Sequence, residues 1–139
     1  YEYLKAVVQE NLRLFPPITY IERRDSADQH LETADGKHRF EVRRDDTMHI
    51  PIYSLHRDEE QFPEPEQFRP ERFLGEPTHH RYSHIPFGSG PRTCIARSLG
   101  LLEAKLAVLH IVRQYRLSVC DQTKVRGYNR DFSFPDLSN

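Results

Sequence analysis

Cys94 lies in a segment whose residues could make its thiol reactive. Around it the chain reads Phe87-Gly88-Ser89-Gly90-Pro91-Arg92-Thr93-Cys94-Ile95-Ala96. Two glycines and a proline predict a tight loop that leads into a helix. The unpaired amides and the dipole at a helix N-terminus favour a thiolate, and Arg92 adds a positive charge nearby. A thiolate here suits a metal ligand, a nucleophile or a redox thiol, whereas a buried inert cysteine beneath a glycine turn is the structural alternative.

The spacing of residues around Cys94 can be compared with the motifs of known kinds of site. A phosphate-binding loop of the form G-x-x-x-x-G-K-[ST] is absent from the sequence. A phosphatase-type loop needs an arginine six residues after the cysteine, and Gly100 stands there. Zinc ligands could come from Cys94 and three nearby histidines, but no paired ligand set elsewhere in the chain completes such a site. These histidines are His79, His80 and His84.

Three other charged segments have ordinary interpretations when each is taken alone. Glu10 and Arg13 stand three residues apart in a predicted helix, which is typical of a solvated ion pair. The segment Phe68-Arg69-Pro70-Glu71-Arg72-Phe73 is typical of a charged turn. The segment Leu55-His56-Arg57-Asp58 is typical of a polar helix cap or turn.

The first half of the chain predicts one helix and a small sheet. Apolar residues recur at helical spacing over residues 2–14, and Pro16-Pro17 then ends the helix. Alternating β-branched and aromatic residues predict strands near 18–21, 39–42 and 48–53. Turn residues at Asp35-Gly36 and Asp45-Asp46 connect them, so we expect a small antiparallel sheet.

The second half predicts an ordered coil and a long helix. Residues 51–91 hold seven of the ten prolines, together with aromatic residues that can be buried. Apolar periodicity predicts a helix over 95–115, with a second stripe of small residues that would let a backbone or a flat ligand approach. After residue 116 the chain is strand-like or irregular. The apolar stripe is Ile95, Leu99, Leu102, Leu106 and Leu109; the small-residue stripe is Ala96, Gly100, Ala104 and Ala107.

The composition indicates that the chain is part of a larger unit. Hydrophobic residues make up 37% of the 139 residues, below the roughly 45–50% apolar share of typical domains. The chain starts at Tyr1 and its only methionine is Met48, so we expect a processed product or a piece of a longer protein. No apolar stretch reaches the roughly 20 residues of a membrane span, and no signal peptide is expected. A net charge of −1 gives no general attraction to nucleic acid, and two cysteines form no disulfide framework.

Taken in order, these motifs resemble the cytochrome P-450 haem-thiolate monooxygenases. Phe87-Gly88-x-Gly90-x-Arg92-x-Cys94 is similar to the family's cysteine-ligand loop, and Glu10-x-x-Arg13 to its K-helix motif. Pro70-Glu71-Arg72-Phe73 is similar to the meander motif, and Leu55-His56-Arg57-Asp58 to a frequent family segment. The resemblance covers nearly the whole chain, from the K helix to just past the L helix.

The resemblance implies a mainly α fold with a small antiparallel β-sheet (α+β), the C-terminal portion of the cytochrome P-450 fold. Residues 1–139 would be a partial domain. Its segments would be the K-helix region (1–15), the small sheet (18–53), the meander (54–86), the haem-thiolate loop (87–96), the L helix (95–115) and C-terminal strands or loop (116–139).

It also implies a role for each matching residue. Cys94 would be the axial thiolate ligand of the haem iron, and Arg92 would pair with a haem propionate. Arg24 is a weaker candidate for a second propionate contact. Glu10, Arg13 and Arg72 would form a buried ion network that fixes the meander to the core. The remaining haem contacts would be Phe87, Gly88, Gly90 and Ala96, where Ala96 replaces the family's usual glycine.

The function implied is that of a monooxygenase that inserts one atom of O₂ into a small hydrophobic organic substrate, with haem as cofactor. Electrons would come from NADPH through a flavoprotein reductase, with a ferredoxin as the alternative. The motifs look like those of microsomal animal members, which implies the cytosolic face of the endoplasmic reticulum membrane and an N-terminal anchor upstream of Tyr1. The oxygen-activating helix would also lie upstream, so we expect the chain alone to be inactive. Two other functions stay open: a catalytically inert truncated product, and a redox-thiol protein without haem.

Overall fold

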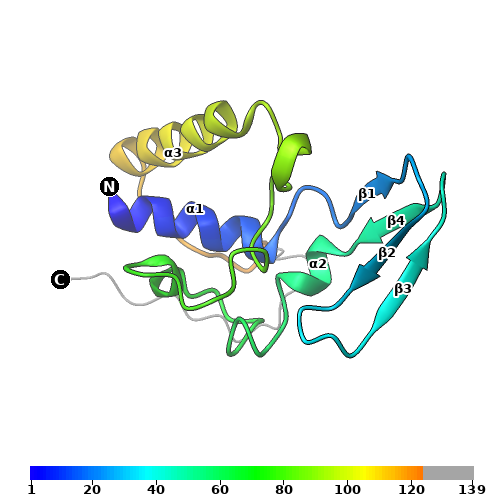
Figure 1. The fold of residues 1–139 in the computed structure, drawn as a ribbon. Coiled ribbons are helices and arrows are strands. Elements are labelled where there is room, and N and C mark those ends of the chain that lie inside the picture. The colour runs from blue at the N-terminus through cyan, green and yellow to red at the C-terminus, as the bar shows by residue number, and fades with distance from the viewer. Residues whose placement is uncertain (124–139) are drawn as a thin grey trace.

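A computed structural model describes residues 1–123 of the chain. Two helices lie side by side, α1 and α3, and four short strands extend from one end of this pair (Figure 1). A proline-rich meander, residues 56–86, runs along the side of α1 opposite to α3. This mixture of helices and small antiparallel sheets confirms the predicted α+β class. The elements in chain order are α1 (Glu2–Leu14), β1 (Ile21–Arg24), β2 (Gln29–Glu32), β3 (Arg39–Val42), β4 (Thr47–Ile50), α2 (Ile52–Leu55), η1 (Pro70–Phe73), η2 (Gly90–Arg92) and α3 (Arg97–Gln114).

Helix α1 has the bounds that its periodicity predicts. It ends at Leu14, where the amide of Phe15 still donates to the carbonyl of Asn11 at 2.8 Å and Pro16 follows. Its buried residues include both apolar and charged side chains, an unusual mixture because charged groups are rarely buried without partners. These residues are Ala6, Val8, Glu10, Arg13 and Leu14.

The predicted sheet is two separate antiparallel pairs. β1 pairs with β4, so that Ile21 lies opposite Ile50, and β2 pairs with β3. The first strand begins at Ile21 rather than residue 18. The strand expected over 48–53 already ends at Ile50, because Pro51 lies at the N-cap of α2. All four residues of β2 are exposed, and such a strand gives no alternating pattern to detect.

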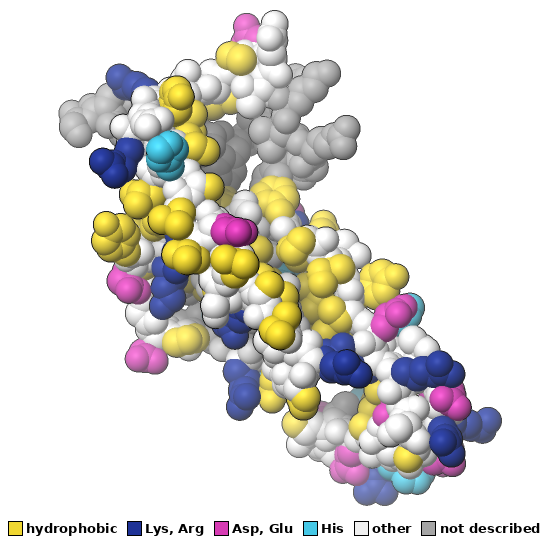
Figure 2. Space-filling model, turned by 90° about the horizontal axis from the view of Figure 1, so that it is seen from above, with side chains coloured by type: hydrophobic (Ala, Val, Ile, Leu, Met, Phe, Trp, Pro, Cys, Tyr) yellow, Lys and Arg dark blue, Asp and Glu magenta, His cyan; other side chains and the backbone are white. Residues whose placement is uncertain are grey.

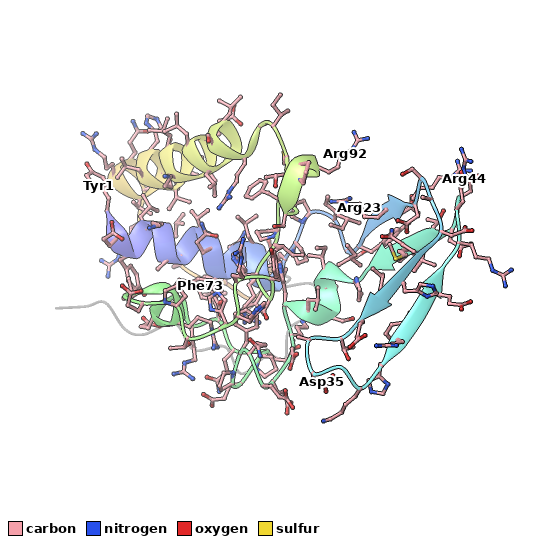
Figure 3. The ribbon with its side chains drawn as sticks, in the orientation of Figure 1. Tyr1, Arg23, Asp35, Arg44, Phe73 and Arg92 are labelled. Atoms are coloured by element: carbon pink, nitrogen blue, oxygen red, sulfur yellow. The ribbon has the colours of Figure 1, made fainter. Side chains whose placement is uncertain are left out.

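The core lies between α1, α2 and the meander. Its largest fully buried apolar side chains are Leu14, Ile52 and Phe62, each about 1% exposed. Phe73, at the end of η1, points inward below α1 and its ring lies 6.5 Å from that of Phe62 (Figure 3). The proline-rich segment is therefore ordered coil packed on a core, as its aromatic residues predict.

Helix α3 is shorter than the predicted 95–115 and is poorly covered. It begins at Arg97 and ends at Gln114, and none of its residues is buried among residues 1–123. Hydrophobic side chains gather on the face that carries it (Figure 2). Residues 115–120 form no helix or strand, a turn follows at 121–122, and the rest of the predicted segment 116–139 lies outside the described residues.

Candidate functional site

The segment that carries Cys94 is closed by its own backbone. We define residues 87–94 as the cysteine loop. The Cys94 amide donates to the Phe87 carbonyl at 2.9 Å, which joins the two ends of the loop. Gly88 and Gly90 have φ of 72° and 74°, a region that other residues avoid because of their Cβ atoms. The two glycines therefore let the loop turn tightly enough to bring residue 94 back to residue 87.

Cys94 carries a free, exposed thiol just ahead of α3. Its carbonyl accepts the amide of Arg97, the first helical residue, at 3.3 Å. The sequence placed Cys94 directly at the helix start, but Ile95 and Ala96 form a turn between the loop and α3. The alternative of a buried inert cysteine is wrong, because the side chain is accessible.

Two arginines lie in or beside the loop, Arg92 and Arg23, and Arg23 was not expected from the sequence. Arg92 lies in the loop and is exposed. Arg23 on β1 is partly buried, and its Nη2 atom lies 4.0 Å from the position that a Cβ atom would take on Gly88. Arg24 instead pairs with Asp45 at 3.3 Å, with 70% of its side chain exposed. Because neighbouring strand residues point to opposite faces, Arg23 rather than Arg24 lies on the face toward the loop. The propionate contact expected for Arg24 stays a prediction, and Arg23 is a second candidate for it.

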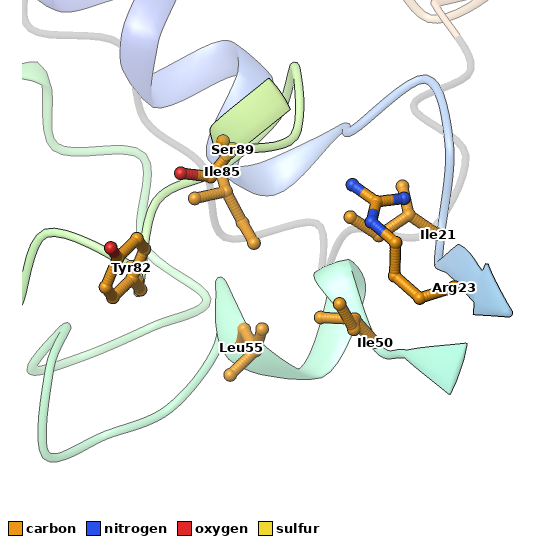
Figure 4. A pocket seen from close by; sticks show the side chains of 8 residues that line it. Ile21, Arg23, Ile50, Leu55, Tyr82, Ile85 and Ser89 are labelled. Carbon is orange, nitrogen blue, oxygen red and sulfur yellow. The ribbon is translucent and has the colours of Figure 1, made fainter. Parts of the chain in front are cut away.

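A cavity of about 410 Å³ opens beside Arg23 and the loop. Figure 4 shows Arg23 and Ile21 on one side of it, Ile85 and Ser89 on the other, and Leu55 below. Its walls are mainly apolar, with one guanidinium at the rim. The lining residues are Ile21, Arg23, Ile50, Leu55, Tyr82, Ile85, Ser89 and Gly90.

Small and aromatic residues support the other face of the loop. Phe87 is half-buried, and its Cε1 atom lies 3.8 Å from where a Cβ atom on Gly100 would be. The small residue at position 100 therefore gives the ring room against α3. Ala96 is exposed at the start of the same helix.

The structure brings Glu10, Arg13 and Arg72 together as a buried ion cluster, the name used below for these three residues. Arg13 donates to Glu10 Oε2 from Nε at 2.7 Å and to Oε1 from Nη2 at 2.9 Å. Both side chains are 0% exposed. Arg72 adds a contact from Nε to Glu10 Oε1 at 3.2 Å, and the Arg69 amide donates to the same oxygen at 2.8 Å. The meander is thus tied to α1 through one carboxylate.

Arg13 is saturated with partners. Besides Glu10, its guanidinium donates to the carbonyl of His56 at 2.8 Å and to that of Gln67 at 3.2 Å. It also lies 5.4 Å from the centre of the Phe62 ring. Such full pairing is what allows a charge to be buried, since an unpaired buried ion is very costly.

The segment Leu55-His56-Arg57-Asp58 caps α1 from a distance. His56 is fully buried, and its Nδ1 lies 3.2 Å from the Arg13 carbonyl, one of the last four carbonyls of the helix. Arg57 donates from Nη2 to the Leu14 carbonyl at 2.7 Å. The sequence indicated a cap or turn here, but it gave no sign that the capped helix would be α1, more than 40 residues earlier.

A second histidine accompanies His56, and sequence reasoning missed this pairing. The rings of His56 and His84 stack with their centres 5.0 Å apart, and His84 Nε2 lies 3.2 Å from the Gln9 carbonyl. Burial lowers the pKa of His56 to about 4 and that of His84 to about 3. Both rings are therefore neutral near pH 7. No local pattern in the sequence links His56 and His84, which stand 28 positions apart.

A zinc site finds no support in the geometry. Within residues 1–123, no group of three or more His, Cys, Asp or Glu side chains is arranged to hold a metal ion. His84 is instead engaged with Gln9 and His56.

The residues around the cysteine loop fit haem. An accessible thiol can ligate iron, and Gly90 leaves open space, because no atom lies within 4 Å of the Cβ position there. The apolar walls suit a porphyrin, and the guanidinium groups of Arg23 and Arg92 suit its two anionic propionates. The donor set thus has the right chemistry for a thiolate-ligated haem.

Comparisons with known proteins agree with this fit. The sequence model of cytochrome P450 matches residues 1–137. The chain is 41% identical over 124 residues to cytochrome P450 9c1 of Drosophila melanogaster and 41% identical over 126 residues to cytochrome P450 3A40 of Oryzias latipes. These alignments cover 88% and 89% of this chain. A third relative, lithocholate 6-beta-hydroxylase of Mesocricetus auratus, is 40% identical over 125 residues, or 88% of the chain.

A solved structure has the same arrangement of elements. It is the retinoic acid-bound cyanobacterial CYP120A1, with a TM-score of 0.71 and 31% sequence identity over 81% of this chain and 26% of that one. The chain spans about a quarter of the length of the curated relatives, 24% for each of the three above. Within residues 1–123, no helix combines the length and apolar character that crossing a membrane requires.

Proposed function

The chain belongs to the cytochrome P450 family, and on that premise we propose that it forms the thiolate-bearing wall of a haem monooxygenase. The observation that carries the proposal is the cysteine loop. Its ends are joined by the bond from the Cys94 amide to the Phe87 carbonyl, and it presents an accessible thiol beside two arginines. When bound, haem supplies the iron at which O₂ is activated.

Cys94 would hold the haem iron through its thiolate, which would donate electron density to the metal. Gly88 and Gly90 keep the backbone close to the sulfur, and hydrogen bonds from this backbone would tune how strongly the thiolate donates. The Phe87 ring lies against Gly100 of α3 and so supports the start of the loop. Ala96 is small enough to permit close approach at the helix start.

Arg92 and Arg23 hold the two propionates. A guanidinium–carboxylate contact is charge-assisted and directional, so it orients the macrocycle as well as binding it. The buried ion cluster touches neither haem nor substrate in this proposal. It fixes the meander on α1 and keeps the base of the site rigid.

For the whole protein we propose insertion of one oxygen atom into a small hydrophobic organic substrate. The names of similar proteins support this class, since they include a lithocholate hydroxylase and a structure bound to retinoic acid. Electrons would come from NADPH through a flavoprotein reductase, and the protein would lie on the cytosolic face of the endoplasmic reticulum membrane. The animal relatives at about 40% identity support both assignments.

The test is the absorption spectrum of the complete haem protein, reduced and saturated with carbon monoxide. We expect the red-shifted Soret band typical of thiolate ligation. Cys94→Ala should abolish this band, because no other sulfur belongs to the loop. Cys120→Ala is the matched control and should leave it unchanged, since Cys120 lies beyond α3 and bonds with Thr123.

Other results would contradict the proposal in different ways. A red-shifted band that persists in Cys94→Ala would show that another residue is the ligand. Protein that binds no haem but forms mixed disulfides at Cys94 would favour the redox-thiol function. Protein that shows neither property would favour an inert product.

A further inference from the structure

His56 makes one hydrogen bond at each ring nitrogen, and each leads to a different part of the fold. Its Nδ1 lies 3.2 Å from the carbonyl of Arg13, in the buried ion cluster. Its Nε2 lies 3.0 Å from the amide nitrogen of Ile85, two residues before the cysteine loop. The ring is fully buried, so no water competes for either position.

These partners fix the protonation state of the ring. A backbone amide can only donate, so Nε2 must accept and carries no proton. A carbonyl can only accept, so Nδ1 must carry the proton and donate. The ring is therefore the neutral Nδ1–H tautomer. Burial, which lowers the pKa of His56 to about 4, maintains this state near neutral pH.

The bond to Ile85 continues into the cysteine loop. The carbonyl of Ile85 accepts the amide of Gly88 at 2.9 Å, and Gly88 is the first residue of the loop with a positive φ. The carbonyl of Phe87, the residue just before Gly88, accepts the amide of Cys94. His56 therefore holds the segment that supplies both acceptors, the carbonyls of Ile85 and Phe87.

We propose that His56 is a positioning residue for the cysteine loop, which it anchors to the buried ion cluster through the Ile85 amide. This proposal rests on the proposed function for its consequence, the placement of the Cys94 thiolate under the iron. Its structural content does not, because the same bonds can be measured without haem.

The local electrostatics are consistent with a neutral linker. Arg13 and Arg57 face the ring from α1 and from its own segment, and His84 stacks on it from the meander, with His79 behind His84. A proton added to Nε2 would meet the amide hydrogen of Ile85, so protonation removes the acceptor and releases the loop.

Two substitutions separate the linking role from general packing. His56→Leu keeps a similar volume but removes both bonds. His56→Gln restores an oxygen that can accept from Ile85 and an amide group that can donate to Arg13. Leu14→Ala is the control, because Leu14 is 1% exposed in the same core and its side chain forms no hydrogen bond.

The first measurement is amide hydrogen exchange in the complete protein, with haem and after its removal. In His56→Leu, we expect exchange at Ile85, Gly88 and Cys94 to accelerate at least about tenfold relative to the middle of α1, which corresponds to one lost hydrogen bond. His56→Gln should restore most of this protection. Leu14→Ala should not accelerate these three amides selectively, even where its melting temperature is equally low.

The second measurement is the carbon monoxide spectrum of the same proteins. His56→Leu should show a smaller fraction of the thiolate-type band than Leu14→Ala at equal haem content. A wild-type protein without that band would refute the proposed function, while the exchange data would still decide the role of His56. Equal losses in His56→Leu and Leu14→Ala, or no recovery in His56→Gln, would overturn the positioning role.

A third measurement needs no variant. Nitrogen-15 NMR of the histidine rings at neutral pH should show a protonated Nδ1 and an unprotonated Nε2 for His56. The opposite tautomer, or a doubly protonated ring, would contradict the proposal directly.

Discussion

The two long sides of α1 differ in what packs against them. On the meander side, Glu10 and Arg13 are 0% exposed, and each of their charged groups has partners within the chain. On the α3 side, the neighbouring helix has no buried residue among the described part of the chain. One side is completed by this chain itself, whereas the other presents apolar surface without cover.

The contrast shows what each kind of surface requires. A buried charge is very costly without its partners, so the buried ion cluster needs all of its members, and this chain supplies them from α1 and the meander. An apolar helix face can stay exposed until another part of the protein or a ligand packs against it. Leu99, Leu102 and Leu106 are 50–56% exposed, and the chain spans about a quarter of its relatives' length. We therefore expect the rest of the P450 fold and the haem to cover this side.

We expect the largest loss of stability from a substitution on the meander side of α1. Glu10→Ala leaves Arg13 as a buried charge without its carboxylate, and we expect a loss of about 3–5 kcal/mol in the free energy of unfolding, together with failure to retain haem. Thermal or denaturant unfolding and haem content of the complete protein measure both effects. A variant with wild-type melting temperature and haem content would show that the cluster is dispensable.

The exposed pair Arg39–Glu32 is the control for this prediction. Its atoms are also 2.7 Å apart, but the side chains are 78% and 44% exposed. Arg39→Ala should therefore cost well under about 1 kcal/mol, since solvent screens such pairs. Equal losses in the two variants would mean that burial is not what distinguishes the sites.

Two leucines test the contrast with identical chemistry. Leu14 is 1% exposed and Leu102 is 50% exposed. In the 139-residue chain, Leu14→Ala should cost about 2–5 kcal/mol, while Leu102→Ala should cost less than half as much because no cavity is created. In the complete haem protein the two costs should become similar. A small cost for Leu102→Ala in both proteins would show that α3 stays uncovered.

Two buried histidines on the meander side should make the stability depend on pH. The unfolded chain binds a proton at each histidine near pH 6.5, but burial lowers the pKa of His56 to about 4 and that of His84 to about 3. Their contribution is therefore complete above about pH 6.5 and is lost as pH falls toward 4. The slope is at most about 1.4 kcal/mol per pH unit for each ring.

Denaturant unfolding between pH 7 and 4.5 measures this slope, and His84→Gln provides the comparison. The variant lacks one of the two titrating rings, so its stability should fall less steeply than that of the wild type. Parallel curves for the two proteins would mean that His84 is not buried in the neutral form.

Local patterns in the sequence predicted the elements, and they failed where contacts are distant. The period of apolar residues predicted α1 to within a residue, because one face of this helix is buried. Strand β2 was missed because its four residues are all exposed. Arg24 was named from the sequence and Arg23 was not, although Arg23 alternates with Ile21 along β1 and lines the cavity with it.

The candidate site divides in the same way. Cys94 and its glycines were found from the sequence because a tight loop leaves a local signature. The role of His56 was not, because it depends on Arg13 and Ile85, which lie 43 and 29 residues away. A local motif can indicate a cap, but only the fold shows which helix is capped. The fold also shows that the second ring nitrogen of His56 accepts from the Ile85 amide.

The length of chain that the buried ion cluster encloses has a consequence for synthesis. Glu10 bonds with Arg69 and Arg72 across 59 and 62 residues. At about 5–20 residues per second on the ribosome, these partners emerge roughly 3–12 seconds after Glu10, whereas a helix forms within about a microsecond. During that interval α1 holds only its own solvated pair of Glu10 and Arg13. Translation that stops before residue 72 would therefore release a helix whose acidic residue never receives the Arg72 guanidinium.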